Sequence, residues 1–420
     1  MRFIKIMILL ALIALPVLAQ DADESTTFTT YHGLDGNRYI DGSGSFPDVG
    51  AAQIELDGDA IPVWLVGAYD GDVLRWLYQT ANGQTGHIDV DFGGQTVNVT
   101  TGDVYAGILA GTRDDAGDFG VVPLPEDASA QSHPILTGEQ TIYVADKGDV
   151  VIRNVDGEIA RQSLAALPDA RIVIERETNR AAVYVSATDE RYVHNVLGDA
   201  LEAAALVVLD LDDLSIQARI DLEGSDVFEG ISPLWADVDE DGSIDLVTTV
   251  SNGRDGAGVR VYSADDGSLM AQGPVIGQGN RWRHQLAWGP FGLNGENELI
   301  DVLTPHIGGV AEFYRFADDQ LAIIAQTPGY TSHIIGTRNL DMALAGDFNG
   351  DGQPELAIPT QDRRAIVGLQ RSDASIVGEV WRLALDSGRV VSNLAAVSLA
   401  DDGLALAAGL DTGQVQIWVP

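Results

Sequence analysis

The sequence contains no cysteine, only two lysines and, beyond its first twenty residues, no apolar run long enough to span a membrane. The absence of cysteine excludes disulfide bonds, thiolate zinc sites, cysteine nucleophiles and a lipoprotein anchor. The sequence also lacks a Gly-x-Ser-x-Gly elbow, a His-Glu-x-x-His motif, a phosphate-binding loop and a dinucleotide-binding fingerprint. It therefore names no complete catalytic constellation.

Positive charge is scarce. The 420 residues include 63 Asp and Glu but only 24 Lys and Arg, which gives a formal charge of −39. Such a chain repels phosphate backbones and anionic lipid headgroups, so we expect no nucleic-acid partner. Hydrophobic residues nevertheless make up 45% of the chain and charged residues only 21%, so it can bury a large core and is not a disordered acidic tail.

The N-terminus has the pattern of a secretory signal peptide. Arg2 and Lys5 precede an apolar run from Met7 to Leu18, and small residues flank a cleavage point after Ala19. A membrane anchor is the alternative, but the apolar run is short for a bilayer span. We therefore predict a signal peptide at 1–19 and a secreted protein, extracellular, periplasmic or at the cell surface, without membrane insertion. Cleavage would leave 22 basic and 63 acidic residues, a formal charge of −41.

One strand-like segment recurs along the chain, as a short apolar run followed by a turn rich in Asp, Asn or Gly. The copies begin near residues 73, 150, 207, 261, 313, 367 and 415, and each follows a second apolar run. A period near 50 residues with several short strands in each repeat is typical of a β-propeller. A β-sandwich array is the alternative, but it does not require such regular spacing.

We therefore predict an all-β fold, a seven-bladed β-propeller over residues 46–420. The long first gap is interpreted as an insertion at residues 113–134. The last blade lacks an outer strand, so we expect residues 20–45 to act as a leader and closing strand, with a strand from about Phe28 to Ile40 completing the ring.

Two acidic loops between the first and second strands of blades four and six have the spacing of a cation chelate. Oxygen ligands alternate along each loop, and a glycine permits the sharp turn after the third ligand. The predicted ligands of the first loop are Asp237, Asp239, Asp241, the carbonyl of Ser243, and Asp245; those of the second are Asp347, Asn349, Asp351, the carbonyl of Gln353, and Glu355.

We expect each loop to bind Ca²⁺ rather than Mg²⁺, whose small octahedral shell fits such a chelate poorly. The alternative is an Asp-Gly turn without metal. The corresponding loop of blade five has lost most of its ligands, and we interpret it as a decayed copy without an ion; it retains Pro290, Gly292, Asn294, Glu296 and Glu298.

These two loops carry a resemblance to a known family. Ala236 to Leu246 and Ala345 to Leu356 resemble the FG-GAP and VCBS-type repeat propellers, the group that includes the integrin α-subunit head. The resemblance is good in blades four and six, weak in blade five, and limited to the strand period elsewhere. It implies structural calcium on one face, with adhesion or recognition of a carbohydrate or protein elsewhere on the propeller.

The face opposite the acidic loops gathers basic and aromatic residues in the predicted loops. We expect a ligand site there for an acidic glycan or protein segment, gripped by arginines and stacked on a tryptophan. The candidates are Arg191, Arg281, Trp282, Arg283, His284, His306 and Arg363. The alternative is that the arginines of this face neutralise neighbouring acids such as Asp189, Asp255 and Asp362.

The predicted function is thus a secreted, monomeric, calcium-stabilised binding or adhesion module. Two alternatives stay open: a polysaccharide lyase or hydrolase that uses His284 or His306 on the same face, and a purely structural module of the cell surface.

Overall fold

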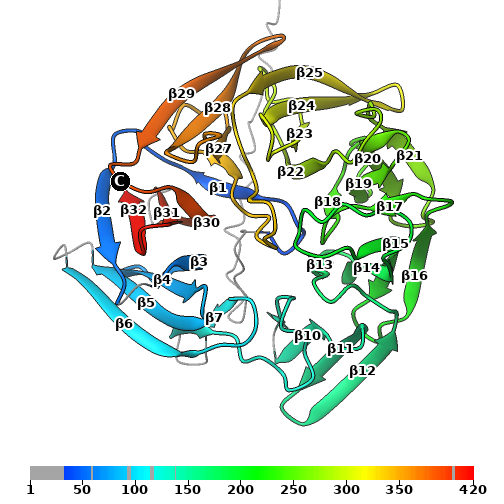
Figure 1. Ribbon diagram of the computed structural model, residues 1–420, viewed down its shortest axis with the longest axis horizontal. Helices are drawn as coiled ribbons and strands as arrows, with labels where there is room; N and C mark the ends of the chain where they lie inside the picture. Colours follow the sequence, from blue (N-terminus) through cyan, green and yellow to red (C-terminus); the bar gives the residue numbers. More distant parts are fainter. Residues whose placement is uncertain (1–32, 58–59, 92–95, 114–117, 138, 400–402) are drawn as a thin grey trace, which may run out of the picture.

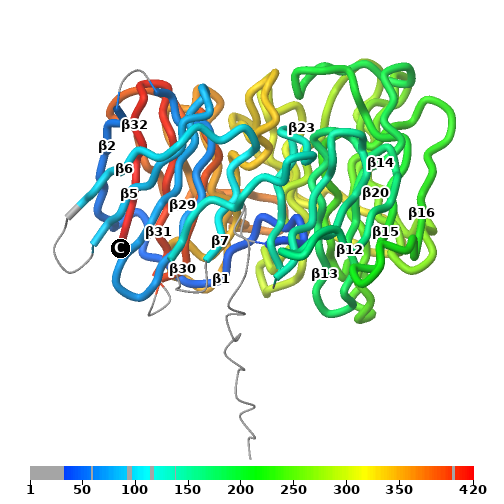
Figure 2. The backbone as a smooth tube through the Cα atoms, turned by 90° about the horizontal axis from the view of Figure 1, so that it is seen from below, coloured from blue at the N-terminus to red at the C-terminus, as the bar shows by residue number. Residues whose placement is uncertain are grey.

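The fold is a ring of β-sheets (Figure 1). A computed structural model describes residues 33–420, except 58–59, 92–95, 114–117, 138 and 400–402. The regular elements of this described part are all strands. In side view the molecule is a short disc, and its strands run between the two faces (Figure 2). No helix in the described part is long and apolar enough to cross a membrane. The predicted signal peptide lies outside the described residues.

The strand pairings group into seven four-stranded antiparallel blades, each of which runs from an inner strand at the axis to an outer strand at the rim. In this order, blade one is β3 (Pro62–Tyr69), β4 (Val73–Thr80), β5 (Gln84–Asp91) and β6 (Thr96–Val104); blade two is β9 (Ile135–Thr137), β10 (Gln140–Val144), β11 (Asp149–Asn154) and β12 (Gly157–Ser163). Blade three is β13 (Val173–Glu175), β14 (Arg180–Thr188), β15 (Glu202–Asp210) and β16 (Ile216–Asp221).

The remaining blades repeat this plan. Blade four is β18 (Leu234–Ala236), β19 (Asp245–Asn252), β20 (Gly256–Ser263) and β21 (Leu269–Gln272); blade five is β22 (Arg283–Gly289), β23 (Glu298–Leu303), β24 (Val310–Ala317) and β25 (Gln320–Pro328). Blade six is β26 (Leu344–Asp347), β27 (Glu355–Pro359), β28 (Ala365–Asp373) and β29 (Ile376–Ala384); blade seven is β30 (Val390–Ser398), β31 (Leu404–Leu410), β32 (Gln414–Val419) and β2 (Gly50–Glu55). The short β17 (Val227–Phe228) pairs with both β15 and β19.

An N-terminal strand closes the ring, as predicted, but it lies later in the chain than predicted. The outer strand of blade seven is β2, paired antiparallel with β32, and not the stretch from Phe28 to Ile40. Residues 28–32 of that stretch lie outside the described part. Its end enters β1 (Tyr39–Ser43), which pairs in parallel with β26 and crosses the middle of the ring (Figure 1).

The first repeat also differs in register from the others. The copy at residue 73 is β4, the second strand of its blade, whereas the copy near residue 150 is β11, a third strand. Because the first copy is a second strand and the next copy is a third strand, the distance between the copies at residues 73 and 150 is longer than one blade repeat. Part of the remaining length forms a separate two-stranded sheet of β7 (Gly111–Arg113) and β8 (Phe119–Val121), within or beside the predicted insertion.

Apolar packing between neighbouring blades forms the core. Inner and middle strands are buried on both faces, as in β31, whose seven residues are all buried. Outer strands alternate instead: only Ala218 and Ile220 are buried in β16. Sheets that stack face to face bury both faces of their middle strands, which explains the unbroken Val, Leu and Ala runs in the sequence.

A buried ion pair lies at the axis. Asp341, just before the inner strand of blade six, binds Arg171 through two 2.9 Å contacts and Arg38 through one of 2.9 Å. Arg171 precedes the inner strand of blade three, and blades three and six are not neighbours, so these segments can meet only near the axis. All three side chains are at most 5% exposed. The axis is therefore filled by protein at this level.

Candidate functional site

The alternating strand directions assign the loops to two faces. Loops between first and second strands leave one face, which we call the acidic-loop face. Loops between second and third strands, together with the connections between blades, leave the other, which we call the connection face. The two predicted chelate loops, 237–244 and 348–354, therefore lie on the first face and the predicted ligand residues on or beside the second.

The loop of blade four brings three of its predicted ligands together. Carboxylate oxygens of Asp237, Asp239 and Asp241 lie within 4.8 Å of one another, in an arrangement that can hold a metal ion. Asp245, the first residue of β19, is 3% exposed and accepts a 3.2 Å hydrogen bond from the backbone N–H of Val238. Burial raises the pKa of Asp245 to about 7, because the charged carboxylate loses its hydration, and the three other acids add a smaller increase.

The loop of blade six forms a more enclosed group. Oxygens of Asp347, Asp351 and Glu355 lie within 4.8 Å of one another, and Glu355 is fully buried. Glu355 Oε2 accepts a 2.8 Å hydrogen bond from the N–H of Phe348. Apart from a weak interaction with the indole of Trp381, Oε1 has no hydrogen-bond partner among the described residues. Burial is the main cause that raises the pKa of Glu355 to about 8, and the negative charges of Asp351 and Asp347 are smaller causes that act in the same direction.

The other predicted ligands of this loop have mixed environments. The side chain of Asn349 donates to Asp351 Oδ2 at 3.1 Å, so it lies beside the acidic group. The amide of Gln370 donates to both oxygens of Asp351 and, at 2.9 Å, to the carbonyl of Gln353. The Gln353 carbonyl therefore lies near the same carboxylate. In blade four, the N–H of Ser243 donates to Asp241 at 2.7 Å.

The equivalent loop of blade five balances its charge differently. Glu298 is the first residue of β23, as Asp245 and Glu355 are the first residues of β19 and β27, and it is also buried. Both oxygens of Glu298 accept 2.9 Å bonds from Arg371, and Oε1 accepts a 2.5 Å bond from Arg315. Arginine thus supplies the positive charge in the loop that the sequence identifies as decayed.

Most predicted ligand residues of the connection face are bound inside the protein. Trp282 is 2% exposed and its ring stacks on His284, so it is not open to a ligand. Arg283 is buried against Asp301, Glu312 and Tyr314 within blade five. His284 is buried, and its Nδ1 lies 2.8 Å from the hydroxyl of Ser332.

The remaining candidate residues do not form a single ligand-binding site. Arg191 donates to the carbonyl of Leu222 at 2.7 Å, and Arg363 donates to that of Val390 at 2.9 Å. Arg281 is exposed, and His306 is partly exposed. The structure therefore brings Trp282, His284 and His306 together but commits Arg191, Arg283 and Arg363 to internal contacts.

A hydrogen-bond chain fixes the imidazole of His306. His333 Nε2 lies 2.7 Å from the carbonyl of Thr337, which can only accept, so this nitrogen carries the proton. His333 Nδ1 therefore accepts from His306 Nε2 at 2.5 Å. Burial lowers the pKa of His306 to about 4, with a smaller contribution from His194. His306 is consequently neutral at pH 7, with an unprotonated Nδ1.

His194 forms a second oriented imidazole on the same face. It lies in the β14–β15 loop, is 19% exposed, and its Nδ1 lies 2.5 Å from Oε1 of Glu229, which is 1% exposed. Ser251 donates to the other oxygen of Glu229. Both carboxylate oxygens are thus occupied. Burial raises the pKa of Glu229, and the hydrogen bonds from His194 and Ser251 act against this increase. When Glu229 is ionised, His194 carries its proton on Nδ1. Nε2 is left with a free lone pair, the arrangement of a carboxylate-oriented general base.

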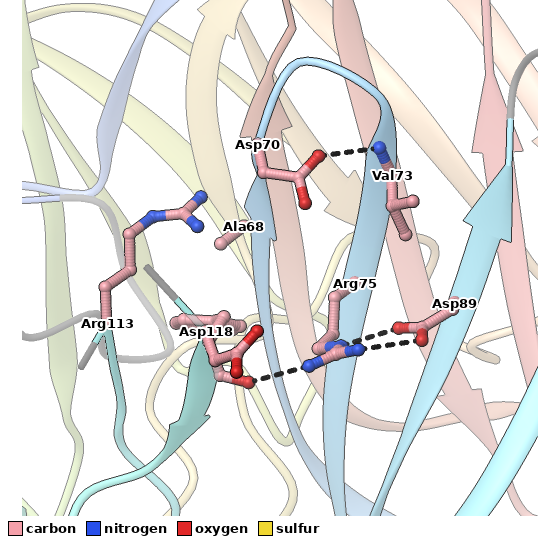
Figure 3. Close-up of a pocket in the computed structure, with 8 residues that line it drawn as sticks. Ala68, Asp70, Val73, Arg75, Asp89, Arg113 and Asp118 are labelled. Carbon is pink, nitrogen blue, oxygen red and sulfur yellow. Dashed lines mark hydrogen bonds and ion pairs between the residues drawn. The ribbon is translucent and has the colours of Figure 1, made fainter. Parts of the chain in front are cut away.

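A small surface pocket lies on blade one beside the β7–β8 sheet (Figure 3). Arg75 binds Asp89 through two contacts of 2.6 and 2.8 Å and the carbonyl of Phe119 at 3.2 Å. The second arginine, Arg113, donates to the carbonyl of Tyr69 at 2.7 Å. Since the protein already satisfies both arginines, the pocket is a weaker candidate than the His194 site.

The sequence alone did not identify Glu229 as a functional residue. It lies 35 positions from His194 in the sequence, and it is one of 63 acidic residues, none of which the sequence pattern singles out as a partner of His194. Only the pairing of β17 with both β15 and β19 places it under the loop that carries His194. The axial ion pair of Arg38, Arg171 and Asp341 was missed for the same reason.

Comparisons with known proteins identify the fold. No protein-family model and no curated protein matches the chain. Solved structures of similar fold include the quinohemoprotein alcohol dehydrogenase of Comamonas testosteroni, with a TM-score of 0.57, 10% identity, and coverage of 92% of this chain and 78% of that one. Another is the quinohemoprotein alcohol dehydrogenase ADHIIG of Pseudomonas putida HK5, with a TM-score of 0.55, 11% identity, and coverage of 93% and 78%. BamB from Moraxella catarrhalis has a TM-score of 0.45 at 13% identity, with coverage of 89% and 100%.

Two predictions are corrected by these findings. The resemblance to FG-GAP and VCBS-type propellers is wrong, because the similar solved propellers are quinohemoprotein alcohol dehydrogenases and no family model matches. The predicted function as a calcium-stabilised adhesion module is wrong on the same comparison. Tight turns favour Asp and Gly in general, so these two loops alone do not identify a family. The β-propeller prediction itself is confirmed.

Proposed function

We propose that this propeller is an enzyme of general-base type, in which His194 Nε2 takes a proton from water or from a substrate hydroxyl group. The observation that carries the proposal is the 2.5 Å contact between the partly exposed imidazole of His194 and the buried carboxylate of Glu229. The carboxylate orients the ring and stabilises its protonated form, which are the two requirements of an imidazole base. His306, held neutral nearby, supplies a hydrogen-bond acceptor.

Cofactor chemistry of the kind named in the similar structures does not fit the residues present. The chain has no cysteine for thioether attachment of a haem. In the described part, Arg38, Arg171 and Asp341 fill the axis, and Val196, Leu197, Ile231, Trp282 and Leu340 form a small apolar cluster at the connection face. No step is therefore assigned to a quinone or a haem.

A substrate screen with paired variants tests the proposal. The protein, purified without residues 1–19, is assayed on panels of chromogenic esters, lactones, amides and glycosides. For any substrate that turns over, His194→Gln should lower kcat/KM by at least about 100-fold, since a positioned base contributes 10²–10⁴-fold. Glu229→Gln should also lower the rate, because the amide can hold the ring in the wrong tautomer.

His87→Gln is the matched control, since His87 is partly exposed on β5 of blade one. Full turnover in His194→Gln would refute the assignment. Export is part of the proposal and rests on the signal-peptide pattern of residues 1–19.

The proposed enzyme also binds Ca²⁺ at the two acidic loops. The fully buried Oε1 of Glu355, without a described hydrogen-bond partner, supports a cation in blade six, because an ionised carboxylate is costly to bury without a positive charge. The residues that would hold the two ions are Asp237, Asp239, Asp241, the carbonyl of Ser243 and Asp245, and Asp347, Asn349, Asp351, the carbonyl of Gln353 and Glu355. Calorimetric titration of chelator-treated protein should give two Ca²⁺ per chain; no heat on Ca²⁺ addition would contradict the sites.

A further inference from the structure

A second buried carboxyl group lies beside Glu229. In the antiparallel pairing of β15 with β17, Ala203 is opposite Phe228, so the next pair places Glu202 opposite Glu229. Directly opposed residues of such a pair have Cβ atoms about 5 Å apart and side chains on the same face. Glu202 is 3% exposed and Glu229 is 1% exposed. Two acidic side chains thus lie next to each other in the interior.

The surroundings of the two groups differ. Glu229 receives hydrogen bonds on both oxygens, from His194 and Ser251, and such donors stabilise an ionised carboxylate. Glu202 Oε2 is buried and has no hydrogen-bond partner among the residues that the structure describes. Burial raises the pKa of both groups, but hydrogen bonds from His194 and Ser251 oppose the increase at Glu229, whereas only the backbone N–H of Gly230 opposes it at Glu202. The environment therefore favours the proton on Glu202 and the charge on Glu229.

Further charges near Glu202 act in the same direction. Asp169 precedes β13 and Asp199 lies in the β14–β15 loop; Arg338, from the connection before β26, binds both of them. Burial raises the pKa of Glu202 well above its ordinary value, and the charges of Glu229, Asp169 and Asp199 raise it further. Burial raises the pKa of the Tyr192 phenol, and the charges of Glu229 and Glu202 raise it further, so this phenol lies close to both acids.

We propose that Glu202 is a positioning residue of the His194 site: its carboxyl group keeps its proton at neutral pH, so that Glu229 alone carries the charge that orients His194. The protonated neighbour limits the buried charge to one, which the imidazolium of His194 balances when it takes a proton. If Glu202 lost its proton, two adjacent buried negative charges would repel each other. The role of Glu202 in turnover rests on the proposed function, but its protonation state does not.

The titration of His194, followed by NMR of histidine-labelled protein, tests the proposal without a substrate. Its signal is identified by its absence in His194→Gln. Glu202→Gln should shift the His194 midpoint by less than about 0.3 pH unit, because a neutral amide replaces a neutral acid. Glu229→Gln should lower the midpoint by about one unit or more, because it removes the charge that stabilises the imidazolium.

Glu190→Gln is the matched control, an exposed glutamate in the same loop as His194, and should leave the midpoint unchanged. A decrease in Glu202→Gln as large as that in Glu229→Gln would overturn the proposal, because it would show that Glu202 carries a negative charge.

Infrared spectroscopy is an independent measurement of the protonation state of Glu202, for use if a variant folds poorly. The carbonyl stretch of a protonated carboxyl group should be present at pH 7 in the native protein and lose the contribution of one group in Glu202→Gln. An unchanged band in a folded variant would overturn the proposal. If His194→Gln leaves turnover intact while these measurements behave as expected, only the proposed function fails.

Discussion

Blades five and six each bury a glutamate at the same position, and the two glutamates have different partners. Glu298 and Glu355 are both the first residue of a second strand, and both are fully buried. Glu298 is paired with Arg371 and Arg315, whereas Glu355 has a single backbone donor and faces two more acids. If the proposed calcium sites are correct, an arginine and a bound cation are alternative solutions to one electrostatic problem, with the arginines in blade five and the cations in blades four and six.

The same substitution in the two blades should therefore depend differently on calcium, and the larger loss of stability is expected in blade five. Glu298→Gln leaves the Arg371 guanidinium, whose side chain is 2% exposed, without its charge partner. We expect a loss of about 3–5 kcal/mol in the free energy of unfolding, the usual cost of breaking a buried ion pair. Urea denaturation with and without Ca²⁺ measures this, and the loss should be independent of the ion.

Glu296→Gln controls for the general effect of losing an acid from this loop. Its side chain is 39% exposed and lies 3.7 Å from Arg315, so the variant should lose less than about 1 kcal/mol. If Glu296→Gln and Glu298→Gln lost the same free energy of unfolding, the burial of Glu298 would not explain the effect of its substitution.

In blade six, the substitution Glu355→Gln should leave the stability of the calcium-free protein unchanged but lower the stability of the protein in the presence of calcium. Glu355→Gln removes a carboxylate that is costly to ionise, so the calcium-free protein should be as stable as the native one or slightly more stable at pH 9. It should bind one Ca²⁺ instead of two and lose about 2.7 kcal/mol of calcium-dependent stabilisation at 100 times the Kd. Thermal melts with Ca²⁺ or chelator measure both effects; an unchanged calcium response would place the ion elsewhere.

The pH dependence of the calcium-free protein should separate the blades further. The pKa of Glu355 is raised by burial from 4.5 to about 8, so the folded state binds more protons than the unfolded state between these values. Its contribution to the free energy of unfolding is present below pH 4.5 and is lost as the pH rises through about 8. The difference between native protein and Glu355→Gln should show this slope in urea titrations at several pH values. Parallel profiles for the two proteins would contradict it.

The smallest effect is expected at the exposed end of the blade four loop. Asp241→Asn keeps an acceptor for the N–H of Ser243, so the calcium-free protein should change by less than about 0.5 kcal/mol. Calcium affinity at that loop should fall, because one charged ligand becomes neutral. Calorimetry would show one weakened and one unchanged site; two unchanged sites would exclude Asp241 as a ligand.

The sequence predicted what depends on local pattern. Buried strands such as β31 are continuous apolar runs, and the acidic groups of blades four and six come from residues close together in the sequence, so both could be predicted from neighbouring residues. Whether these groups bind Ca²⁺ stays a prediction. The position of the closing strand was predicted wrongly, because several polar segments near the N-terminus could pair with β32, and only the ring geometry selects Gly50–Glu55.

The site could not be predicted from local pattern. Arg283 and Trp282 lie at the start of an inner strand and were expected at the surface, but acids of β23 and β24 and the ring of His284 bury them. The contact between His194 and Glu229 depends on the path of a loop across two blades. In a chain with so many acids, composition gives no means of choosing the one that faces an imidazole.

The pairing of β2 with β32 sets the order in which the molecule can be assembled. Residues 50–55 are synthesised long before residues 414–419, so their hydrogen-bond partners do not exist until more than 350 further residues have been made. Until then blade seven is incomplete, and β2 has no strand to pair with. A chain whose ring closes last stays open during synthesis, and an open chain is also one that can be threaded through a translocation channel before it folds.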